Sequence, residues 1–202
     1  MVIQVVLIKL IFLLSSLWAG SENEPASLRV QVMEGTGLII KGSTSISTFE
    51  CESGYFPTED TLLITYERDS GKYRIRHGRL IFRIRDIQCG DPYSNRQMSN
   101  TLKVKKYPFI IADLLEIHPG SGPWYHKSVT ARIELAGNEI IQEIPLRVSS
   151  LKDGNLELKG EQSFRMSTFG LEPPKPMMGL IRVEDKLDIG FSLWVKLVQT
   201  EN

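Results

Sequence analysis

Residues 186–197 alternate between apolar and mostly polar side chains over an unusual length. The apolar positions are Leu187, Ile189, Phe191, Leu193, Val195 and Leu197. A period of two puts all of them on one face of a single β-strand. A strand that is apolar on one face only is typical of an antiparallel sheet with its other face in water. The inner face must therefore cover a core or enclose a space.

The same period recurs along most of the chain, for example in residues 80–84, 129–135 and 144–148. Between these runs stand turn sequences such as Ser70-Gly71, Ala136-Gly137 and Asp153-Gly154, which tolerate tight-turn backbone angles. Short strands joined by tight turns predict an all-β sandwich or barrel. With 202 residues, the chain is long enough for one well-buried domain and short for two.

The N-terminus has the composition of an export signal. Two apolar runs flank Lys9, and the small residues Ala19, Gly20 and Ser21 precede Glu22. We expect a signal peptide over residues 1–21, cleaved after Ser21, and a mature domain over residues 22–202. The alternative is an uncleaved membrane anchor, which Lys9 disfavours because it would lie deep inside the apolar stretch.

Charge and cysteine content narrow the classes further. The 24 basic and 24 acidic residues cancel, and no basic stripe with interleaved aromatics indicates nucleic-acid binding. An exported chain with two cysteines predicts a disulfide between Cys51 and Cys89, which are 38 positions apart. Two separate buried thiols are the alternative.

One helix is predicted, over residues 94–102. Ser94 would be its N-cap and Gln97 would complete a capping box. Met98 and Leu102 would share one face and dock the helix on an end or wall of the sheet structure. Further on, residues 169–179 form a proline-rich loop that contains Met177 and Met178; we interpret it as a mouth or lid, with ordinary packing equally compatible.

Catalytic signatures are missing from the sequence. The three histidines, His77, His118 and His126, have no metal-ligand spacing, and no nucleophile elbow or phosphate-binding loop occurs. The carboxylates fall in or beside turns, and nothing in the sequence pairs two of them. We therefore expect a protein that is not an enzyme and needs no metal or cofactor.

Two stretches of the sequence carry motifs of a known family. The first runs from the segment FRIRDIQCGD at residues 82–91 through Asn95, Met98 and Leu102 to Tyr107 and Pro108, and the second combines FGLEPP at residues 169–174 with LIRVEDKL at 180–187. Both resemble the YceI-like family. Residues 40–51 are similar to a third motif of one branch, although Ser47 replaces its frequent histidine. The likeness covers roughly residues 28–198, which is essentially the whole mature chain.

The resemblance implies a lipocalin-like antiparallel β-barrel of about eight strands, located in the periplasm, that holds an isoprenoid, quinone or fatty acyl chain. An eight-stranded barrel can either admit one small ligand or be filled by its own side chains. A filled barrel that contacts a protein partner through its surface is thus the alternative. Transient contact with a membrane surface is a further expectation, while oligomeric state is not predicted. From the apolar phase of each strand, the expected cavity-lining residues are Phe82, Ile84, Phe109, Ile111, Ile133, Phe164, Met166, Ile189, Phe191 and Leu193.

Overall fold

The computed structural model describes residues 27–54, 61–119, 127–151 and 153–198. The predicted signal peptide and His126 lie outside these ranges. None of the helices within them is both long and apolar enough to traverse a bilayer. The strands are β1 (Ser27–Val32), β2 (Gly37–Thr44), β3 (Thr48–Gly54), β4 (Thr61–Glu67), β5 (Lys72–Arg76), β6 (Arg79–Arg83), β7 (Phe109–His118), β8 (Lys127–Leu135), β9 (Asn138–Ser150), β10 (Leu156–Arg165) and β11 (Val183–Val198). The helical segments include α2 (Pro92–Thr101) and the 3-10 turns η2 (Ile84–Asp86), η3 (Met166–Phe169) and η4 (Met177–Gly179).

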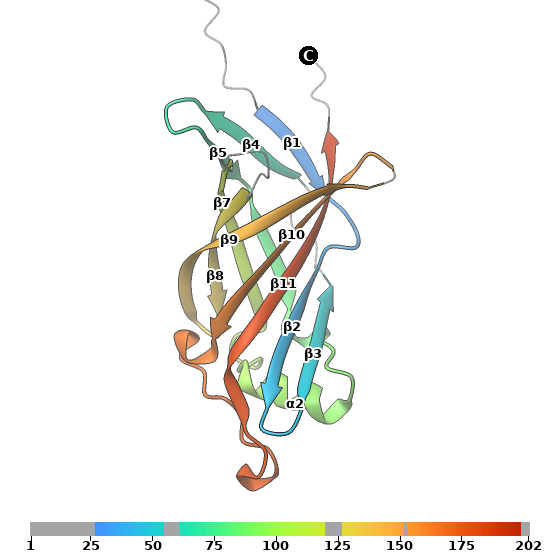
Figure 1. The fold of residues 1–202 in the computed structure, drawn as a ribbon, viewed down its shortest axis with the longest axis vertical. Helices are drawn as coiled ribbons and strands as arrows, with labels where there is room; N and C mark the ends of the chain where they lie inside the picture. The colour runs from blue at the N-terminus through green and yellow to red at the C-terminus, as the bar shows by residue number, and fades with distance from the viewer. Residues whose placement is uncertain (1–26, 55–60, 120–126, 152, 199–202) are drawn as a thin grey trace, which may run out of the picture.

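The strands form a closed antiparallel barrel, as predicted. Its ring follows the order β1-β4-β5-β7-β8-β9-β10-β11, and β11 returns to β1 through pairs such as Arg29 with Val198. Most neighbours along the chain are joined by tight turns (Figure 1). At the β8–β9 turn, Ala136 and Gly137 both have positive φ values, 52° and 81°, which is the geometry of a hairpin with matching twist.

The barrel has an upper and a lower part that share their long strands. The upper part of β11 pairs with β1, whereas the segment from Leu187 to Ser192 pairs with β2, which continues to β3. On the opposite wall, the upper part of β7 pairs with β5 and its lower part with β6. The chain therefore forms a second, lower wall from β2, β3 and β6, which lies below β1, β4 and β5 in Figure 1.

Two short breaks let the chain pass from the upper wall to the lower wall. Between β1 and β2, Gly35 has a φ of 95°, and the ring of Trp194 would lie 2.8 Å from a Cβ at this position. Between β5 and β6, a Cβ on Gly78 would lie 2.4 Å from the carbonyl oxygen of Leu114. Both breaks therefore need glycine, because the chain passes too close to its neighbours for a side chain.

The lower wall is closed between β3 and β6 by a disulfide. Cys51 in β3 is bonded to Cys89, just beyond η2, with the Cα atoms 4.1 Å apart. Next to it, Glu52 and Gln88 exchange two backbone hydrogen bonds of 2.9 and 2.8 Å. The predicted disulfide is thus confirmed. It covalently joins two segments that the isolated bridge between Glu52 and Gln88 also connects.

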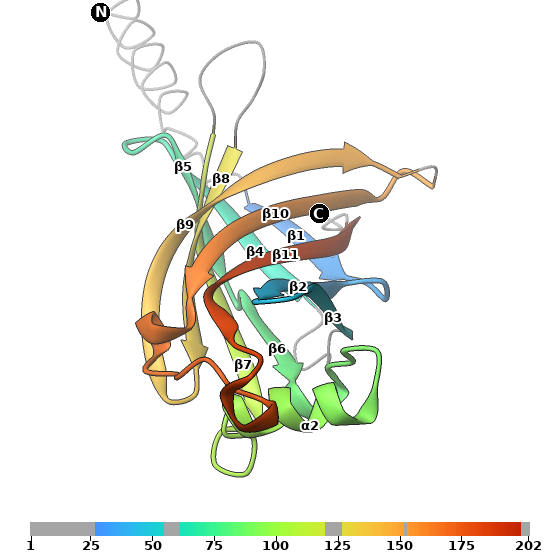
Figure 2. The same cartoon turned by 60° about the horizontal axis from the view of Figure 1, so that its bottom comes forward.

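Helix α2 lies below the ends of β3 and β6 (Figure 2). It begins earlier than predicted, because Asp91 rather than Ser94 is its N-cap. The Asp91 carboxylate accepts hydrogen bonds from the backbone N–H groups of Tyr93 and Ser94 at 2.9 and 3.0 Å. Pro92 sets the start of the helix, since it lacks an N–H and its fixed φ suits the first helical position. The docking face is as predicted: Leu102 is buried and Met98 packs beside it.

Removing the disulfide should destabilise the whole fold. A closed loop of this length is worth roughly 4 kcal/mol in the chain-entropy model. We expect the double variant C51A/C89A to lose about that much free energy of unfolding in urea titrations, followed by tryptophan fluorescence. A reductant should destabilise the wild type to the same level and leave the variant unchanged. Equal unfolding midpoints for oxidised wild type and variant would show that the disulfide does not support the lower wall.

Candidate functional site

The interior of the barrel is the candidate site, and it is apolar along its length. Inward-facing residues of the upper part form one cluster, which we call the upper core; it includes Val30, Leu62 and Leu193. A second cluster at the other end, the lower core, includes Ile40, Leu135 and Phe169. Ile110, Ile133 and Ile189 pack against both cores. The two cores are therefore parts of one continuous apolar column.

The structure places most of the predicted lining residues in this column. Phe82 and Leu193 belong to the upper core, and Ile84, Phe164 and Met166 belong to the lower core. Ile84 and Met166 lie in the turns η2 and η3 rather than in strands. The remaining inward residues, Ile133, Ile189 and Phe191, are only partly buried. These three lie where the interior retains accessible space.

Two predicted lining residues, Phe109 and Ile111, face outward instead. Ile111 pairs with Ile81 and Glu134 on the outer face, and Phe109 is 39% exposed. The inward phase of β7 is carried by the neighbours Ile110 and Ala112, which pack against the cores. The strand has apolar residues in both phases, so the alternation that fixes the inner face elsewhere is ambiguous here.

Two polar residues of the interior were not predicted. Gln142 pairs with Ala131, and Gln162 pairs with Ile189; both partners face inward, so the two glutamines share the inward phase. Both side chains are partly buried. Each carboxamide donates to the backbone carbonyl of the next residue, Glu143 or Ser163, which leaves its own carbonyl oxygen as an acceptor. The signal was present in the sequence as one polar residue within an otherwise apolar phase.

The wall between β9 and β10 is interrupted beside these glutamines. The two strands are paired from Leu156 opposite Ser150 to Gly160 opposite Leu146, and below that point they separate (Figure 1). A hollow of about 520 Å³ lies at the separation and is lined by Ile140, Gln142, Ser163, Phe164, Arg165, Thr168, Glu184, Asp185 and Lys186. These residues come from both faces of the sheet, at the point where β9 and β10 are no longer paired.

A larger hollow, of about 1390 Å³, runs across β2, β3, β9, β10 and β11. Its lining combines the outward residues Lys41, Glu161 and Asp188 with the inward residues Phe191 and Gln162. At its floor Gly160 makes room for the Phe191 ring, because a Cβ there would lie 2.3 Å from the ring. Phe191 thus occupies interior volume that a larger residue at position 160 would take.

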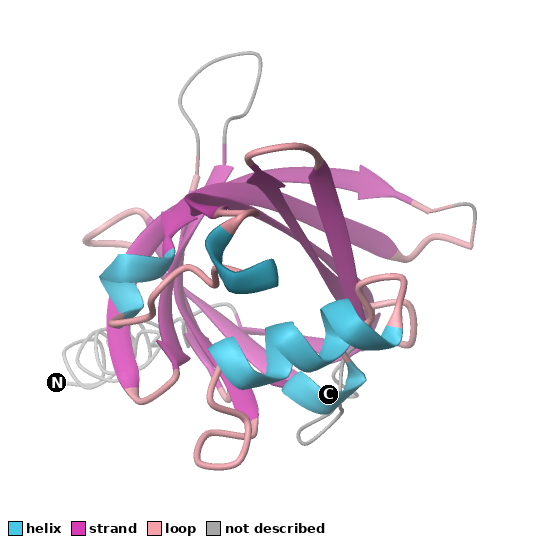
Figure 3. Cartoon of the chain, turned by 90° about the horizontal axis from the view of Figure 1, so that it is seen from below, coloured by secondary structure: helices cyan, strands magenta, loops and turns pink. Residues whose placement is uncertain are grey.

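The lower end of the barrel is closed by helical turns, which Figure 3 shows from below. Phe169 and Leu171 are buried under this end. The turn η3 is held by Asp185, whose carboxylate accepts 2.8 and 2.7 Å hydrogen bonds from the backbone N–H and hydroxyl of Ser167. These bonds, the hydroxyl first, hold the pKa of Asp185 below its usual value. The lower closure is therefore tied to the first residues of β11.

Catalytic geometry does not emerge from the described residues. No three His, Cys, Asp or Glu side chains among them are placed to hold a metal ion. His118 bonds to the hydroxyl of Thr130 at 2.7 Å, and neither His77 nor His118 lines the two hollows. The arrangement is an apolar interior with two carboxamides, which can hold a molecule by burial.

These features define a lipocalin-like antiparallel β-barrel with an apolar interior. The sequence matches no protein-family model, and no curated protein resembles it closely enough to count as a match. Solved structures do match. Burkholderia cenocepacia BcnA has a TM-score of 0.60 and 14% identity, covering 80% of this chain and 96% of its own. A polyisoprenoid-binding domain from Saccharophagus degradans, implicated in plant cell wall breakdown, has a TM-score of 0.57 and 12% identity, covering 87% and 100%.

At these identities the likeness shows the fold. The barrel that the sequence motifs of the YceI-like family imply is the barrel that this chain forms. The comparison therefore confirms the expected fold.

The bonds from Ser167 to Asp185 make a direct pH prediction. In the variant Ser167→Ala the hydroxyl donor is lost, so the pKa of Asp185 should rise toward its ordinary value of about 3.9. Because the folded-state pKa is lowered, Asp185 stabilises the fold above about pH 4 and loses this effect as the pH falls through the folded-state pKa. The variant should therefore show a weaker loss of stability on acidification.

Carboxyl NMR titration of Asp185 in both proteins measures the effect. Asp91 at the start of α2 is the internal control. Its pKa is lowered by Ser94, which the variant keeps, so its titration should not change. An unchanged titration of Asp185 in the variant would mean that Ser167 does not hold the carboxylate as described.

Proposed function

We propose that the protein binds one lipophilic molecule, an isoprenoid, a quinone or a fatty acyl chain, inside its barrel, and that it does so without catalysis. The observation that carries this proposal is the accessible middle of the interior. Ile133, Ile189 and Phe191 face inward between the two cores and yet remain partly accessible. A fully packed core would bury such residues.

The chemistry of the interior favours a long apolar ligand. Each methylene that leaves water contributes about 0.8 kcal/mol, so a chain of modest length needs few polar contacts. Gln142 and Gln162 supply amide groups that suit a hydroxyl, carbonyl or quinone oxygen at one end of such a chain. Gln142 lines the hollow between β9 and β10 and Gln162 lines the larger hollow, so both side chains border space that solvent reaches.

Likeness to known proteins supports the same assignment. The Saccharophagus degradans structure of the same fold is described as a polyisoprenoid-binding domain. The family motifs at residues 82–91 and 169–187 lead us to place this chain among the YceI-like proteins. Export through the predicted signal peptide to the periplasm is part of the proposal; the Cys51–Cys89 disulfide supports it, because such bonds persist in oxidising compartments.

Organic extraction of the purified protein, followed by mass spectrometry, tests the proposal. We expect a lipid in near-stoichiometric amount, absent from an equally purified control protein. Filling the interior with Ile189→Phe should lower the retained lipid severalfold, because the added ring volume competes with the ligand for the space beside Phe191.

Ile111→Phe is the matched control for this variant. It makes the same change on the outer face, where Ile111 pairs with Ile81, and should retain lipid as the wild type does. A wild-type protein that extracts clean and also ignores added lipids would overturn the proposal in favour of a filled barrel that acts through its surface.

A further inference from the structure

The lower end of the molecule carries a projecting group of exposed apolar side chains. Met177, Met178 and Leu180 in the η4 loop are 60%, 102% and 78% exposed, and Ile46 in the β2–β3 turn is 72% exposed. We call these four residues the apolar tip. The η4 loop is the lowest point of the molecule in Figure 1, so the tip is convex and reaches beyond the barrel end.

The tip is held in place by backbone hydrogen bonds. Within the loop, the N–H of Val183 donates to the carbonyl of Pro174, and that of Ile181 donates to Pro176. The N–H of Ser45 donates to the carbonyl of Arg182 at 2.8 Å, which joins the β2–β3 turn to the loop. The four apolar side chains are therefore presented together by two connected turns.

The backbone of the tip is itself unfavourable for its residues. Met177 and Met178 have φ values of 54° and 55°, in the left-handed region that favours glycine and asparagine. Side chains with these exposures also leave apolar surface in water. Neither the conformation nor the exposure of the two methionines stabilises the isolated fold, and such strain is characteristic of functional surfaces.

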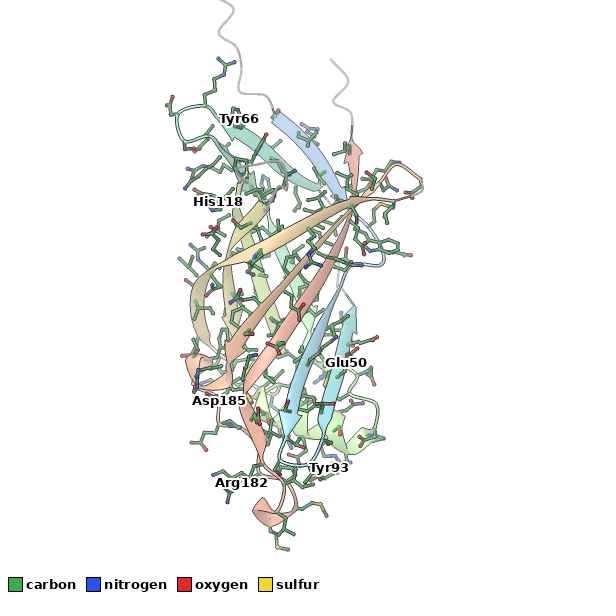
Figure 4. All side chains as sticks on the ribbon, in the orientation of Figure 1. Glu50, Tyr66, Tyr93, His118, Arg182 and Asp185 are labelled. Atoms are coloured by element: carbon green, nitrogen blue, oxygen red, sulfur yellow. A yellow bond between two sulfur atoms is a disulfide. The ribbon has the colours of Figure 1, made fainter. Side chains whose placement is uncertain are left out.

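A pair of basic residues stands directly behind the tip. Lys175 and Arg182 are exposed. They lie on opposite sides of the loop, between the hydrogen bond that joins Pro174 to Val183 and the one that joins Pro176 to Ile181. Within the part of the chain that the structure describes, neither forms an ion pair, whereas nearby Lys186 is paired with Asp188. Figure 4 shows Arg182 at this end of the molecule. Two acidic residues flank the basic pair in the sequence: Glu172 precedes Lys175 and Glu184 follows Arg182, so both are further from the tip along the chain.

We propose that the apolar tip docks the protein on an anionic lipid bilayer, with the four apolar side chains inserted at the interface and Lys175 and Arg182 against the headgroups. An apolar group with cations immediately behind it matches the order of layers in such a membrane. A stable protein interface buries about 800 Å² on each partner, which a convex tip of four side chains does not offer. This docking requires no molecule inside the barrel, so it stands apart from the proposed lipid-binding function.

Co-sedimentation of the mature protein with lipid vesicles tests the proposal. The protein, stripped of any extracted lipid, should bind vesicles that contain phosphatidylglycerol and bind phosphatidylcholine vesicles weakly. The double variant K175Q/R182Q should lose roughly 25-fold in affinity at low salt, since each basic residue near an anionic surface contributes about a fivefold effect. Added salt should weaken the wild type and reduce this difference.

A second variant separates docking from folding. Asparagine tolerates the left-handed region, so M177N/M178N should keep or raise the thermal midpoint while vesicle binding falls by about tenfold or more. The matched control is Ile141→Thr, which removes a similarly exposed apolar side chain, 61% exposed, from the outer face of β9. The control should bind vesicles as the wild type does.

Three results would overturn the proposal. The first is a wild type that ignores anionic vesicles, and the second is an M177N/M178N variant that binds them fully. The third is concentration-dependent self-association without vesicles that this variant abolishes, because the tip would then be a contact between copies of the chain. None of these three results depends on whether organic extraction finds a lipid in the barrel, so the two proposals can fail separately.

Discussion

The pairing of β11 along both of its edges is the constraint on which the rest of the structure depends. One edge is occupied by β10 over the whole length of that strand. The other edge is divided, with β1 at the upper end and β2 at the lower end. Since the same strand closes the upper ring and supports the lower wall, its inward residues line both halves of the interior. A β11 without its alternation of apolar and polar residues would therefore disturb the closure of the ring, the packing of the core and the lining of the candidate site together.

The interior balances packing against space. Both parts of the barrel are packed: Val30 and Leu62 in the upper part are almost completely buried, and the lower end is covered by Phe169 and Leu171. The middle is looser, where Ile133, Ile189 and Phe191 stay partly accessible and β9 separates from β10. A protein selected for stability alone would gain by filling this region, because interior voids forfeit contacts. The disulfide and the two packed parts stabilise the barrel around a middle that remains available.

Sequence alone predicted the parts of the structure where one physical signal dominates. The phase of β11 followed from strict alternation, and the disulfide followed from two cysteines in a chain with a predicted signal peptide. The phase of β7 was wrong because Phe109, Ile110 and Ile111 are consecutive apolar residues, and a register shift near Leu114 disturbs the strand further. The start of α2 was wrong because Asp91 with Pro92 forms a better cap than Ser94. Gln142 and Gln162 escaped notice, since a polar residue in an apolar phase is recognised as internal only when its cross-strand partners are known.

The order of the strands also determines when the barrel can close. The ring requires Arg29 to meet Val198, which are far apart in the sequence, and β11 follows the ten other strands that the structure describes. Contacts between such distant residues make folding slow, because the cost of closing a long loop precedes the contacts that repay it. The growing chain consequently has no closed ring at any stage before β11 emerges. Any machinery that handles this chain during synthesis meets open strand edges rather than a finished barrel.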